Sequence, residues 1–190
     1  MKKLYFLLPI AAISLLLTSC IPSKTSSSDK VENAGGEQNA PAEQSLRDKL
    51  FTGATMVVPD TDIEVTLTQD VTEFGDFNDK TNYGSYGTVA VGKEMTTIKD
   101  GGIATILALN FGGSGESIYL AVFKLGETSW AVSDMQLLGD RIEIKDIKTD
   151  NNLVIVNYKE HGEDQAMAEE PKIEVEKTFE YTNGKLIENK

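Results

Sequence analysis

Hydrophobic residues are concentrated in two segments near the middle of the chain, residues 103–111 and 118–123. Both segments are almost entirely apolar, and a Gly-Gly-Ser-Gly turn at residues 112–115 joins them. Continuous apolar runs of this length are typical of strands buried on both faces. We therefore expect the two segments to form a central antiparallel pair, around which the other strands are arranged.

Polar and apolar residues alternate in the flanking segments, as they do in half-buried strands. The predicted flanking strands are residues 63–69, 88–91, 95–98, 141–147, 153–158, 172–181 and 185–187. Turn residues at 150–152 and at Asn183-Gly184 predict two hairpins. We expect residues 70–87 to form one long polar loop, and we expect no helix of ten residues or more after the N-terminal segment. The pattern predicts a single, mainly antiparallel β domain, built as a sandwich or a strongly bent sheet.

The first twenty residues have the pattern of an export signal. Two lysines precede an apolar run that ends at Leu17, which is shorter than the roughly twenty residues of a membrane span and suits a signal peptide. The run ends in Leu17-Thr18-Ser19-Cys20, which resembles the lipobox of bacterial lipoproteins. The resemblance implies that residues 1–19 are removed as the signal peptide and that Cys20 receives acyl chains such as palmitate. Each buried CH₂ contributes about 0.8 kcal/mol, so two or three chains anchor a protein stably.

The segment that follows Cys20 has low hydrophobicity and is rich in Ser, Gly, Pro and Gln. We expect residues 20–44 to be a disordered tether and residues 45–190 to be the β domain, starting with one or two helical turns capped by Ser45. Residue 21 is Ile, where an Asp would act as an inner-membrane retention signal in related bacterial lipoproteins. By that resemblance the lipid anchor is in the outer membrane, provided that the host has two membranes. A secretory signal with a chance cysteine is the alternative.

Composition limits the chemistry that the chain can carry. The formal net charge is −12, and removal of residues 1–19 leaves thirty acidic against sixteen basic residues, a net charge of −14. Such a surface repels phosphate backbones, so we expect no nucleic-acid partner. With Cys20 as the single cysteine, no disulfide forms within the chain. With His161 as the single histidine, imidazole chemistry is confined to one residue.

Several blocks of the sequence resemble a family of uncharacterised bacterial lipoproteins. The blocks are Gly-Gly-Ser-Gly at 112–115, Leu-Gly-Asp-Arg-Ile at 138–142, Ile-Val-Asn-Tyr at 155–158, Met167 with Glu170-Pro171, and a closing Gly-Lys-Leu at 184–186. The resemblance implies one secreted, lipid-anchored domain and implies no activity. Many relatives carry a calcium-binding Asp-x-Asn-x-Asp-Gly loop before the first central strand, where this chain has Lys99-Asp100-Gly101-Gly102. A calcium role at that position therefore does not transfer to this chain.

The polar loop contains the best candidate for a cation site. Calcium takes oxygen ligands that commonly come from alternating Asp and Asn residues in a flexible loop. Asp76, Asn78 and Asp79 supply two or three such ligands at useful spacing, with Asp70 and Glu73 nearby. The run lacks the Asp-Gly turn and the distal Glu of an EF-hand. A solvated turn is the alternative interpretation.

Other patterns suggest chemistry less directly. The acidic segment around His161 could offer ligands to a transition metal, and a triad built on Ser114 would also need His161. Asp140-Arg141 is expected to be a corner with a local ion pair, or else to supply a ligand-binding arginine. Four aromatic residues could form a glycan platform or belong to the core; they are Tyr83, Tyr86, Tyr119 and Trp130.

Taken together, these patterns predict an envelope lipoprotein with a non-catalytic, membrane-tethered β domain that has a binding or structural role and no cofactor. Its expected partners are the membrane, through the lipid on Cys20, and an unidentified envelope protein or glycan. A further copy could pair at the edge of the hairpin that ends in residues 153–158. The alternatives are a calcium-binding envelope domain and a hydrolase that brings carboxylates of residues 70–79 and 163–170 together.

Overall fold

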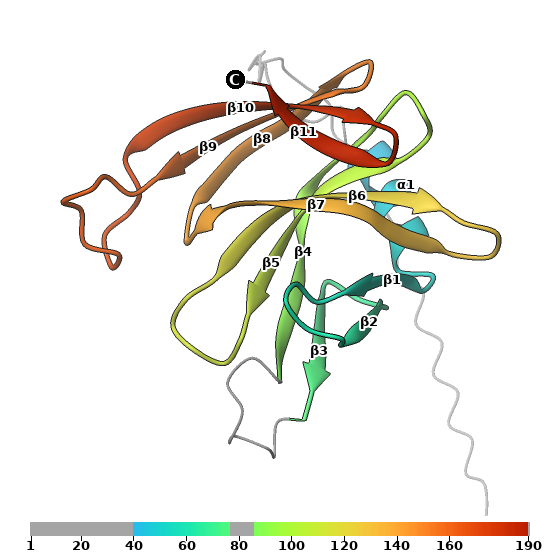
Figure 1. The fold of residues 1–190 in the computed structure, drawn as a ribbon, viewed down its shortest axis with the longest axis horizontal. Helices are drawn as coiled ribbons and strands as arrows, with labels where there is room; N and C mark the ends of the chain where they lie inside the picture. Colours follow the sequence, from blue (N-terminus) through green and yellow to red (C-terminus); the bar gives the residue numbers. More distant parts are fainter. Residues whose placement is uncertain (1–39, 77–85, 190) are drawn as a thin grey trace, which may run out of the picture. The chain divides into compact units, whose positions relative to one another are not determined.

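The computed structural model describes residues 40–76 and 86–189, all of which belong to one compact unit (Figure 1). This part contains one helix and eleven strands. They are α1 (Ala40–Leu50), β1 (Ala54–Val57), β2 (Glu64–Leu67), β3 (Val71–Gly75), β4 (Tyr86–Thr97), β5 (Ile103–Asn110), β6 (Ser117–Leu125), β7 (Trp130–Asp140), β8 (Glu143–Asp150), β9 (Leu153–Glu160), β10 (Ile173–Thr182) and β11 (Lys185–Asn189). The mainly β fold predicted from the sequence is confirmed.

The first seven strands form one strongly curved sheet in the order β2-β1-β7-β6-β5-β4-β3. Its pairs are antiparallel except β1 and β7, which run parallel and are joined at Thr55 and Ala131. The two edge strands, β2 and β3, contact each other, so the curved sheet nearly closes on itself (Figure 1). The predicted central pair, β5 and β6, lies within this sheet with neighbours on both sides.

The last four strands form a second antiparallel sheet in the order β11-β10-β9-β8. This four-stranded sheet packs on the outer face of the curved sheet. Alternate residues of β5 and β6, such as Ile106, Leu120 and Val122, join residues of the second sheet, such as Val156 and Phe179, in one buried cluster. The structure is therefore a bent sheet covered on one side by a smaller sheet, as predicted.

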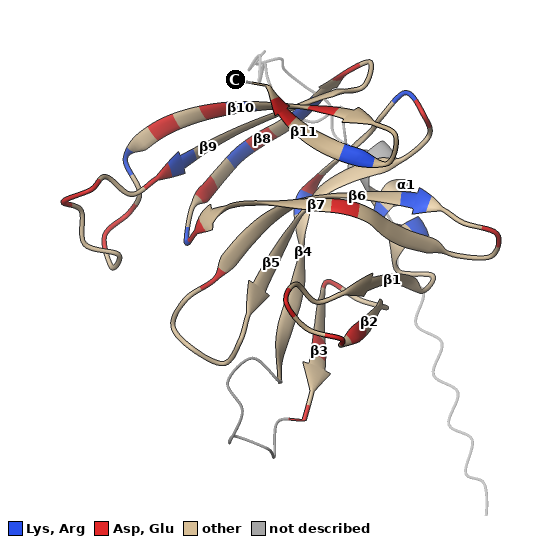
Figure 2. Cartoon of the chain, viewed as in Figure 1, with Lys and Arg blue, Asp and Glu red and all other residues tan. Residues whose placement is uncertain are grey.

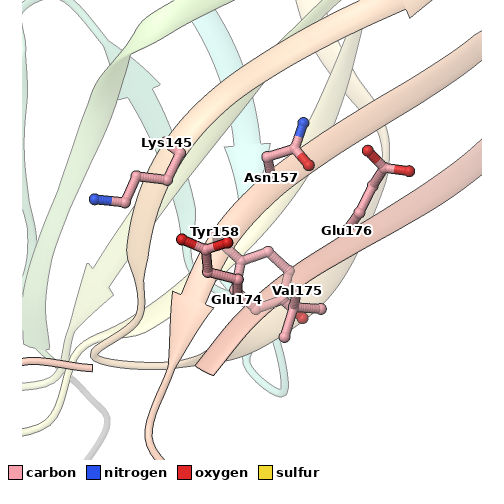
Figure 3. A pocket seen from close by; sticks show the side chains of 6 residues that line it. All are labelled: Lys145, Asn157, Tyr158, Glu174, Val175 and Glu176. Carbon is pink, nitrogen blue, oxygen red and sulfur yellow. The ribbon is translucent and has the colours of Figure 1, made fainter. Parts of the chain in front are cut away.

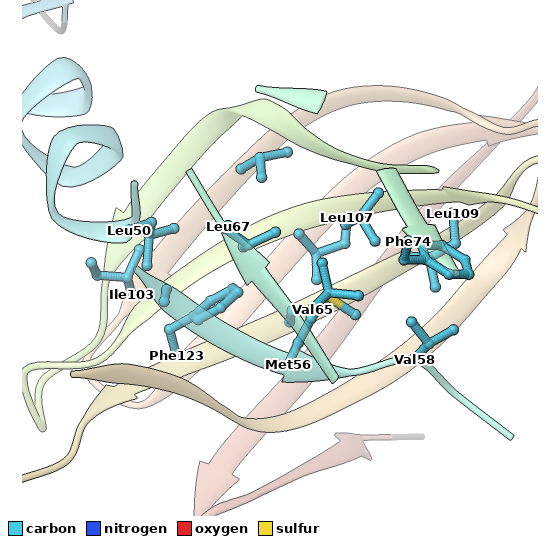
Figure 4. Packing of buried hydrophobic residues seen from close by; sticks show 14 of the residues in the cluster. Leu50, Met56, Val58, Val65, Leu67, Phe74, Ile103, Leu107, Leu109 and Phe123 are labelled. Carbon is cyan, nitrogen blue, oxygen red and sulfur yellow. The ribbon is translucent and has the colours of Figure 1, made fainter. Parts of the chain in front are cut away.

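A separate cluster fills the inside of the curved sheet (Figure 4). The other alternate residues of β5 and β6 point into it, including Ile103, Leu107 and Phe123, none of which is more than 1 % exposed. Leu50 of α1 is fully buried in the same cluster. Strands β5 and β6 thus supply both cores, which is why their sequences are apolar at nearly every position.

Arg47 anchors helix α1 to strand β4. In β4 the ladder to β5 shifts between Val91 and Met95, so that residues 92–94 bulge out opposite Ile106. The Arg47 guanidinium donates to the Val91 carbonyl at 3.2 Å and to the Gly92 carbonyl at 3.0 and 3.1 Å. A Cβ at Gly92 would lie 2.9 Å from the Cβ of Ile106, so only glycine fits the bulge there. The helix is therefore attached to the bulge of β4 through the backbone carbonyls of Val91 and Gly92.

Several local predictions were wrong. Helix α1 has eleven residues and begins at Ala40, so Ser45 lies inside it instead of capping it. Residues 71–75 form β3 rather than part of a long loop. Gly92 and Lys93 interrupt the pairing of β4 but do not divide it into two strands. In each case packing against the rest of the domain overrides a locally polar or glycine-containing sequence.

Candidate functional site

The predicted calcium loop is only partly within the described residues. Asp76 directly follows β3, whereas Asn78 and Asp79 lie outside the described residues. The nearby Asp70 carboxylate lies 3.2 Å from the Arg47 guanidinium and thus contacts the helix. In the described ranges, no group of three or more His, Cys, Asp or Glu residues is placed to hold a metal ion. The calcium site therefore stays a prediction.

The segment between β9 and β10 folds back on itself through local hydrogen bonds. The His161 Nε2 atom lies 2.9 Å from the Glu169 carbonyl oxygen, and the Lys172 ammonium lies 2.8 Å from the Glu169 carboxylate. The hydrogen bond from Lys172 lowers the pKa of the Glu169 carboxyl. A shallow concavity of about 550 Å³ lies over this segment and Ile173. His161 therefore stabilises the conformation of this segment. Ser114 lies in the turn between β5 and β6 of the other sheet, so the two residues do not support a catalytic triad.

The Asp140-Arg141 pair forms the predicted corner between β7 and β8. Arg141 has a positive φ of 50°, and its Nε and Nη2 atoms lie 3.0 and 2.9 Å from Oδ2 of Asp140. The other carboxylate oxygen, Oδ1, accepts a 2.8 Å hydrogen bond from the Glu116 amide, and the Arg141 amide donates to the Glu116 carbonyl. The predicted local ion pair is confirmed, and it fixes the point where the chain passes from one sheet to the other.

Two residues of the predicted aromatic platform, Tyr119 and Trp130, do not come together. Tyr119 and Trp130 are half-buried, and both pack against the cluster inside the curved sheet. They lie about 20 Å apart along the β6–β7 ladder, since Tyr119 pairs with Leu137 and Trp130 with Leu125. Tyr83 is outside the described residues. Core packing, the alternative interpretation, therefore accounts for Tyr119 and Trp130.

The two loops that would supply the carboxylates of the predicted hydrolase belong to different sheets. Residues 70–76 belong to the curved sheet, whereas residues 163–170 connect two strands of the four-stranded sheet. A glycosidase-type acid and base must flank the same bond. The described residues give no support for such a pair.

A polar groove on the four-stranded sheet is a concavity that the sequence did not predict (Figure 3). Its volume is about 330 Å³, and its lining residues are Lys145, Asn157, Tyr158, Glu174, Val175 and Glu176. Tyr158 and Val175 are opposite each other in the β9–β10 ladder and face the curved sheet. Because side chains alternate along a strand, Asn157, Glu174 and Glu176 face away from it. The outward-facing part of the groove lining is therefore polar.

Hydrogen bonds fix the polar residues at one side of this groove. Asn157 Nδ2 donates to Oδ1 of Asp146 at 2.7 Å, and Lys145 Nζ donates to Glu143 at 2.6 Å. Hydrogen bonds from the Lys148 ammonium and then from Asn157 lower the pKa of the Asp146 carboxyl. The two groove glutamates project from the same strand, β10, and do not face each other across the groove (Figure 3). This arrangement suits contact with a polar partner better than acid–base catalysis.

The residues that line this groove follow no sequence pattern that distinguishes them from other exposed strand residues. Glu174 and Glu176 alternate with apolar residues, as in any exposed strand face. Lys145 is displaced by a shift in the β8–β9 ladder between Ile144 and Asp146, and a shift of this kind has no clear sequence mark. The hollow is lined by residues of three adjacent strands, β8, β9 and β10, one of which carries this shift.

A second polar cluster connects the two sheets. The Asp134 carboxylate accepts hydrogen bonds from the Leu186 amide at 2.8 Å and from the Lys185 ammonium at 3.0 Å. Burial raises the pKa of the Asp134 carboxyl, but the hydrogen bonds from Leu186, Lys185 and Gln136 together outweigh burial and hold this pKa below its usual value. Next to it, Ser133 Oγ lies 2.7 Å from the Tyr181 hydroxyl. These contacts attach β7 to the β10–β11 hairpin. Because the polar groups of this cluster bond to one another, they do not form a ligand site.

Comparison with known proteins gives no relative: no family model, no curated protein and no solved structure matches this chain. Within the described residues, α1 is not long and apolar enough to span a membrane.

Proposed function

We propose that this chain is a lipoprotein of the bacterial cell envelope, in which a non-enzymatic β domain with a binding or structural role is tethered to the membrane through Cys20. The observation that carries the proposal is the Leu17-Thr18-Ser19-Cys20 sequence at the end of a short apolar run. A thiol at this position is the nucleophile that lipid transfer requires. Ile21 favours the outer membrane in a host with two membranes.

The spacing between Cys20 and the domain supports the tether. Residues 21–39 separate the lipid-bearing cysteine from the start of α1 at Ala40. A flexible chain of this length has an end-to-end distance of about 24 Å. The domain could therefore reach a partner near the membrane surface while staying anchored.

The polar contacts of the domain support a non-enzymatic role. Polar groups that the sequence suggested have structural partners: Arg141 pairs with Asp140, Asp70 with Arg47, and His161 with the Glu169 carbonyl. A catalytic acid or base needs a position from which it can exchange a proton with a substrate. The groove on the four-stranded sheet is instead open and polar, and we assign it as the contact face for an envelope protein or a glycan.

Metabolic labelling with palmitate tests the anchor. We expect the wild-type chain to incorporate label and to sediment with membranes, and Cys20→Ser to lose both properties. The control is the double variant Cys20→Ser/Ser23→Cys, which keeps one thiol but moves it out of the Leu-Thr-Ser-Cys sequence; it should also remain unlabelled. Equal labelling of the wild type and Cys20→Ser would contradict the proposal.

Photo-crosslinking in intact cells tests the contact face. A photoreactive residue in place of Glu176, which lines the groove, should form a discrete crosslinked product with an envelope component. The matched control is Glu127, an exposed acidic residue in the turn between β6 and β7 of the curved sheet. If the two positions gave the same products, or none, the groove would not be the contact face.

A further inference from the structure

Strand β8 is an edge of the four-stranded sheet. It pairs with β9 on one side, and no strand of the described ranges pairs with it on the other. Lysines and acidic residues alternate along it (Figure 2). An edge of this kind exposes backbone donors and acceptors that can pair with another chain.

The side chains of β8 divide between two faces. Ile144 and Ile147 point toward the curved sheet, where they are half-buried at the margin of the cluster between the sheets. Glu143, Asp146 and Lys148 point away from it, opposite Lys159, Asn157 and Ile155 of β9. The edge therefore presents two incompletely buried isoleucines beside a row of charges.

The order of these residues is self-complementary. When residues 143–148 are placed antiparallel to a second copy, with a twofold axis between residues 145 and 146, Glu143 faces Lys148, Ile144 faces Ile147, and Lys145 faces Asp146. Every charged residue of this segment then faces an opposite charge, and every isoleucine faces an isoleucine. Cross-strand pairs of both kinds stabilise antiparallel ladders.

We propose that two copies of the chain associate through β8 in this register and form one continuous eight-stranded sheet from their two four-stranded sheets. The interface is symmetric, as in most homodimers. It covers Ile144 and Ile147 and pairs the free backbone groups of the edge. Because the groove beside β8 includes Lys145, the two grooves of the dimer lie on either side of the twofold axis.

The ladder shift at Lys145 favours β8 of a second copy over other strands as the pairing partner. Relative to β9, Lys145 is an extra residue, and edge lysines and bulges generally prevent pairing with unrelated strands. In the self-paired register six residues face six, and each Lys145 meets Asp146 of the other copy. The same charges that repel other edges therefore favour a second copy.

A charge-reversal series, measured by analytical ultracentrifugation on the full-length chain in detergent, tests the pairing. Lys148→Glu places Glu143 of each copy opposite a glutamate, and we expect it to weaken the dimer about tenfold. The double variant Glu143→Lys/Lys148→Glu restores both pairs between copies, so its dimer should regain wild-type strength. Within one chain, however, the double variant places like charges at positions 143 and 145 and at 146 and 148. A purely intrachain effect would therefore make it the weakest variant.

Disulfide formation tests the register in a Cys20→Ser background, which removes the native thiol. Glu143→Cys and Lys148→Cys chains should crosslink when mixed, because facing Cβ atoms lie about 4.5–5.5 Å apart. Either chain alone should not, since identical positions are five residues, about 17 Å, out of register. Glu143→Cys mixed with Asp150→Cys is the control for a shifted register.

Two results would overturn the dimer: a wild-type chain that sediments as a monomer at every concentration, or a double charge variant whose dimer is weaker than that of Lys148→Glu. Neither result bears on palmitate labelling at Cys20, so the failure of this proposal and the failure of the lipid anchor can be told apart.

Discussion

The Tyr158 hydroxyl is a buried polar group without a partner in the described part of the chain. The residue is 1 % exposed and packs between the two sheets. An unsatisfied buried hydroxyl costs about 1–3 kcal/mol of folding free energy. We therefore expect Tyr158→Phe to be neutral or to raise the free energy of unfolding by up to about 1 kcal/mol, measured by urea denaturation.

Tyr181→Phe is the matched control for this substitution. Tyr181 is buried in the same cluster, but its hydroxyl lies 2.7 Å from Ser133 Oγ. Its removal should lower the free energy of unfolding by about 1 kcal/mol. Equal destabilisation by both substitutions would contradict our view that the Tyr158 hydroxyl has no partner.

The same hydroxyl predicts a dependence on alkaline pH. Burial, and then the negative charges of Glu160 and Glu188, raise the pKa of Tyr158 to about 12. The unfolded chain loses this proton near its ordinary value of 10.0, while the folded chain retains it. The contribution of Tyr158 to stability is thus complete below pH 10, and about 2–3 kcal/mol of it is lost as the pH rises to 12. We expect the stability difference between Tyr158→Phe and the wild type to widen over this range and to be constant below it.

Asp134 predicts the opposite dependence at acid pH. Its folded pKa is below the ordinary value of 3.8, so its stabilising contribution is present above that value and is lost as the pH falls through the folded pKa. Asp134→Asn should lower the free energy of unfolding by about 1.5–3 kcal/mol at pH 7, and the difference from the wild type should shrink below pH 4. Lys185→Met, which removes an exposed partner, should cost less than about 1 kcal/mol. A difference for Asp134→Asn that is constant with pH would contradict this assignment.

Residue roles were predictable where the partners are close in sequence. The Asp140-Arg141 corner and the Asn183-Gly184 turn could be inferred because a local pair and a two-residue turn each have a recognisable sequence. The roles of Arg47 and Asp134 could not. Arg47 contacts carbonyls 44 and 45 residues away, and Asp134 contacts groups 51 and 52 residues away. Such contacts exist only once the strands are placed.

At the scale of elements, α1 depends on the bulge of β4. Arg47 is 15 % exposed in its side chain and donates to two backbone carbonyls at the bulge, those of Val91 and Gly92. Arg47→Met should lower the free energy of unfolding by about 1–3 kcal/mol, measured by urea denaturation, because those carbonyls lose their donors.

Two further variants separate the carbonyl contacts from the ion pair. Arg47→Lys keeps the charge near Asp70 but cannot reach two carbonyls with a planar group, so it should recover little stability. Asp70→Asn should cost less than about 1 kcal/mol, since this carboxylate is 69 % exposed. If Arg47→Lys behaved as the wild type, the ion pair and not the carbonyl contacts would anchor the helix.

The composition of α1 explains why the start of this helix was predicted wrongly. Its first residues, Ala-Pro-Ala-Glu-Gln, continue the Pro-, Ala- and Gln-containing composition of the predicted tether. The stabilising contacts come from the last turn, where Leu50 is fully buried inside the curved sheet. Packing at one end therefore stabilises a helix whose beginning has the composition of a tether.

For the whole domain, apolar patterning was enough to predict the fold class but not the strand order. Continuous apolar runs in β5 and β6 required two covered faces, and the structure supplies a core on each side. The parallel pairing of β1 with β7 and the near-closure of β2 on β3 had no local signal, because short half-buried strands fit many neighbours. The polar groove was missed for another reason: it includes Lys145 at the shift in the β8–β9 ladder, and a shift of this kind has no clear sequence mark.

Because β5 and β6 belong to both cores, the two sheets should unfold together. Trp130, the single tryptophan, packs against the cluster inside the curved sheet. Val156 is fully buried in the other cluster, in β9. Val156→Ala should cost about 1–3 kcal/mol, and this loss should shift the urea midpoint of Trp130 fluorescence by as much as the midpoint of the circular dichroism signal. A shift in circular dichroism alone would mean that the four-stranded sheet unfolds separately, and that the shared strands do not couple the cores.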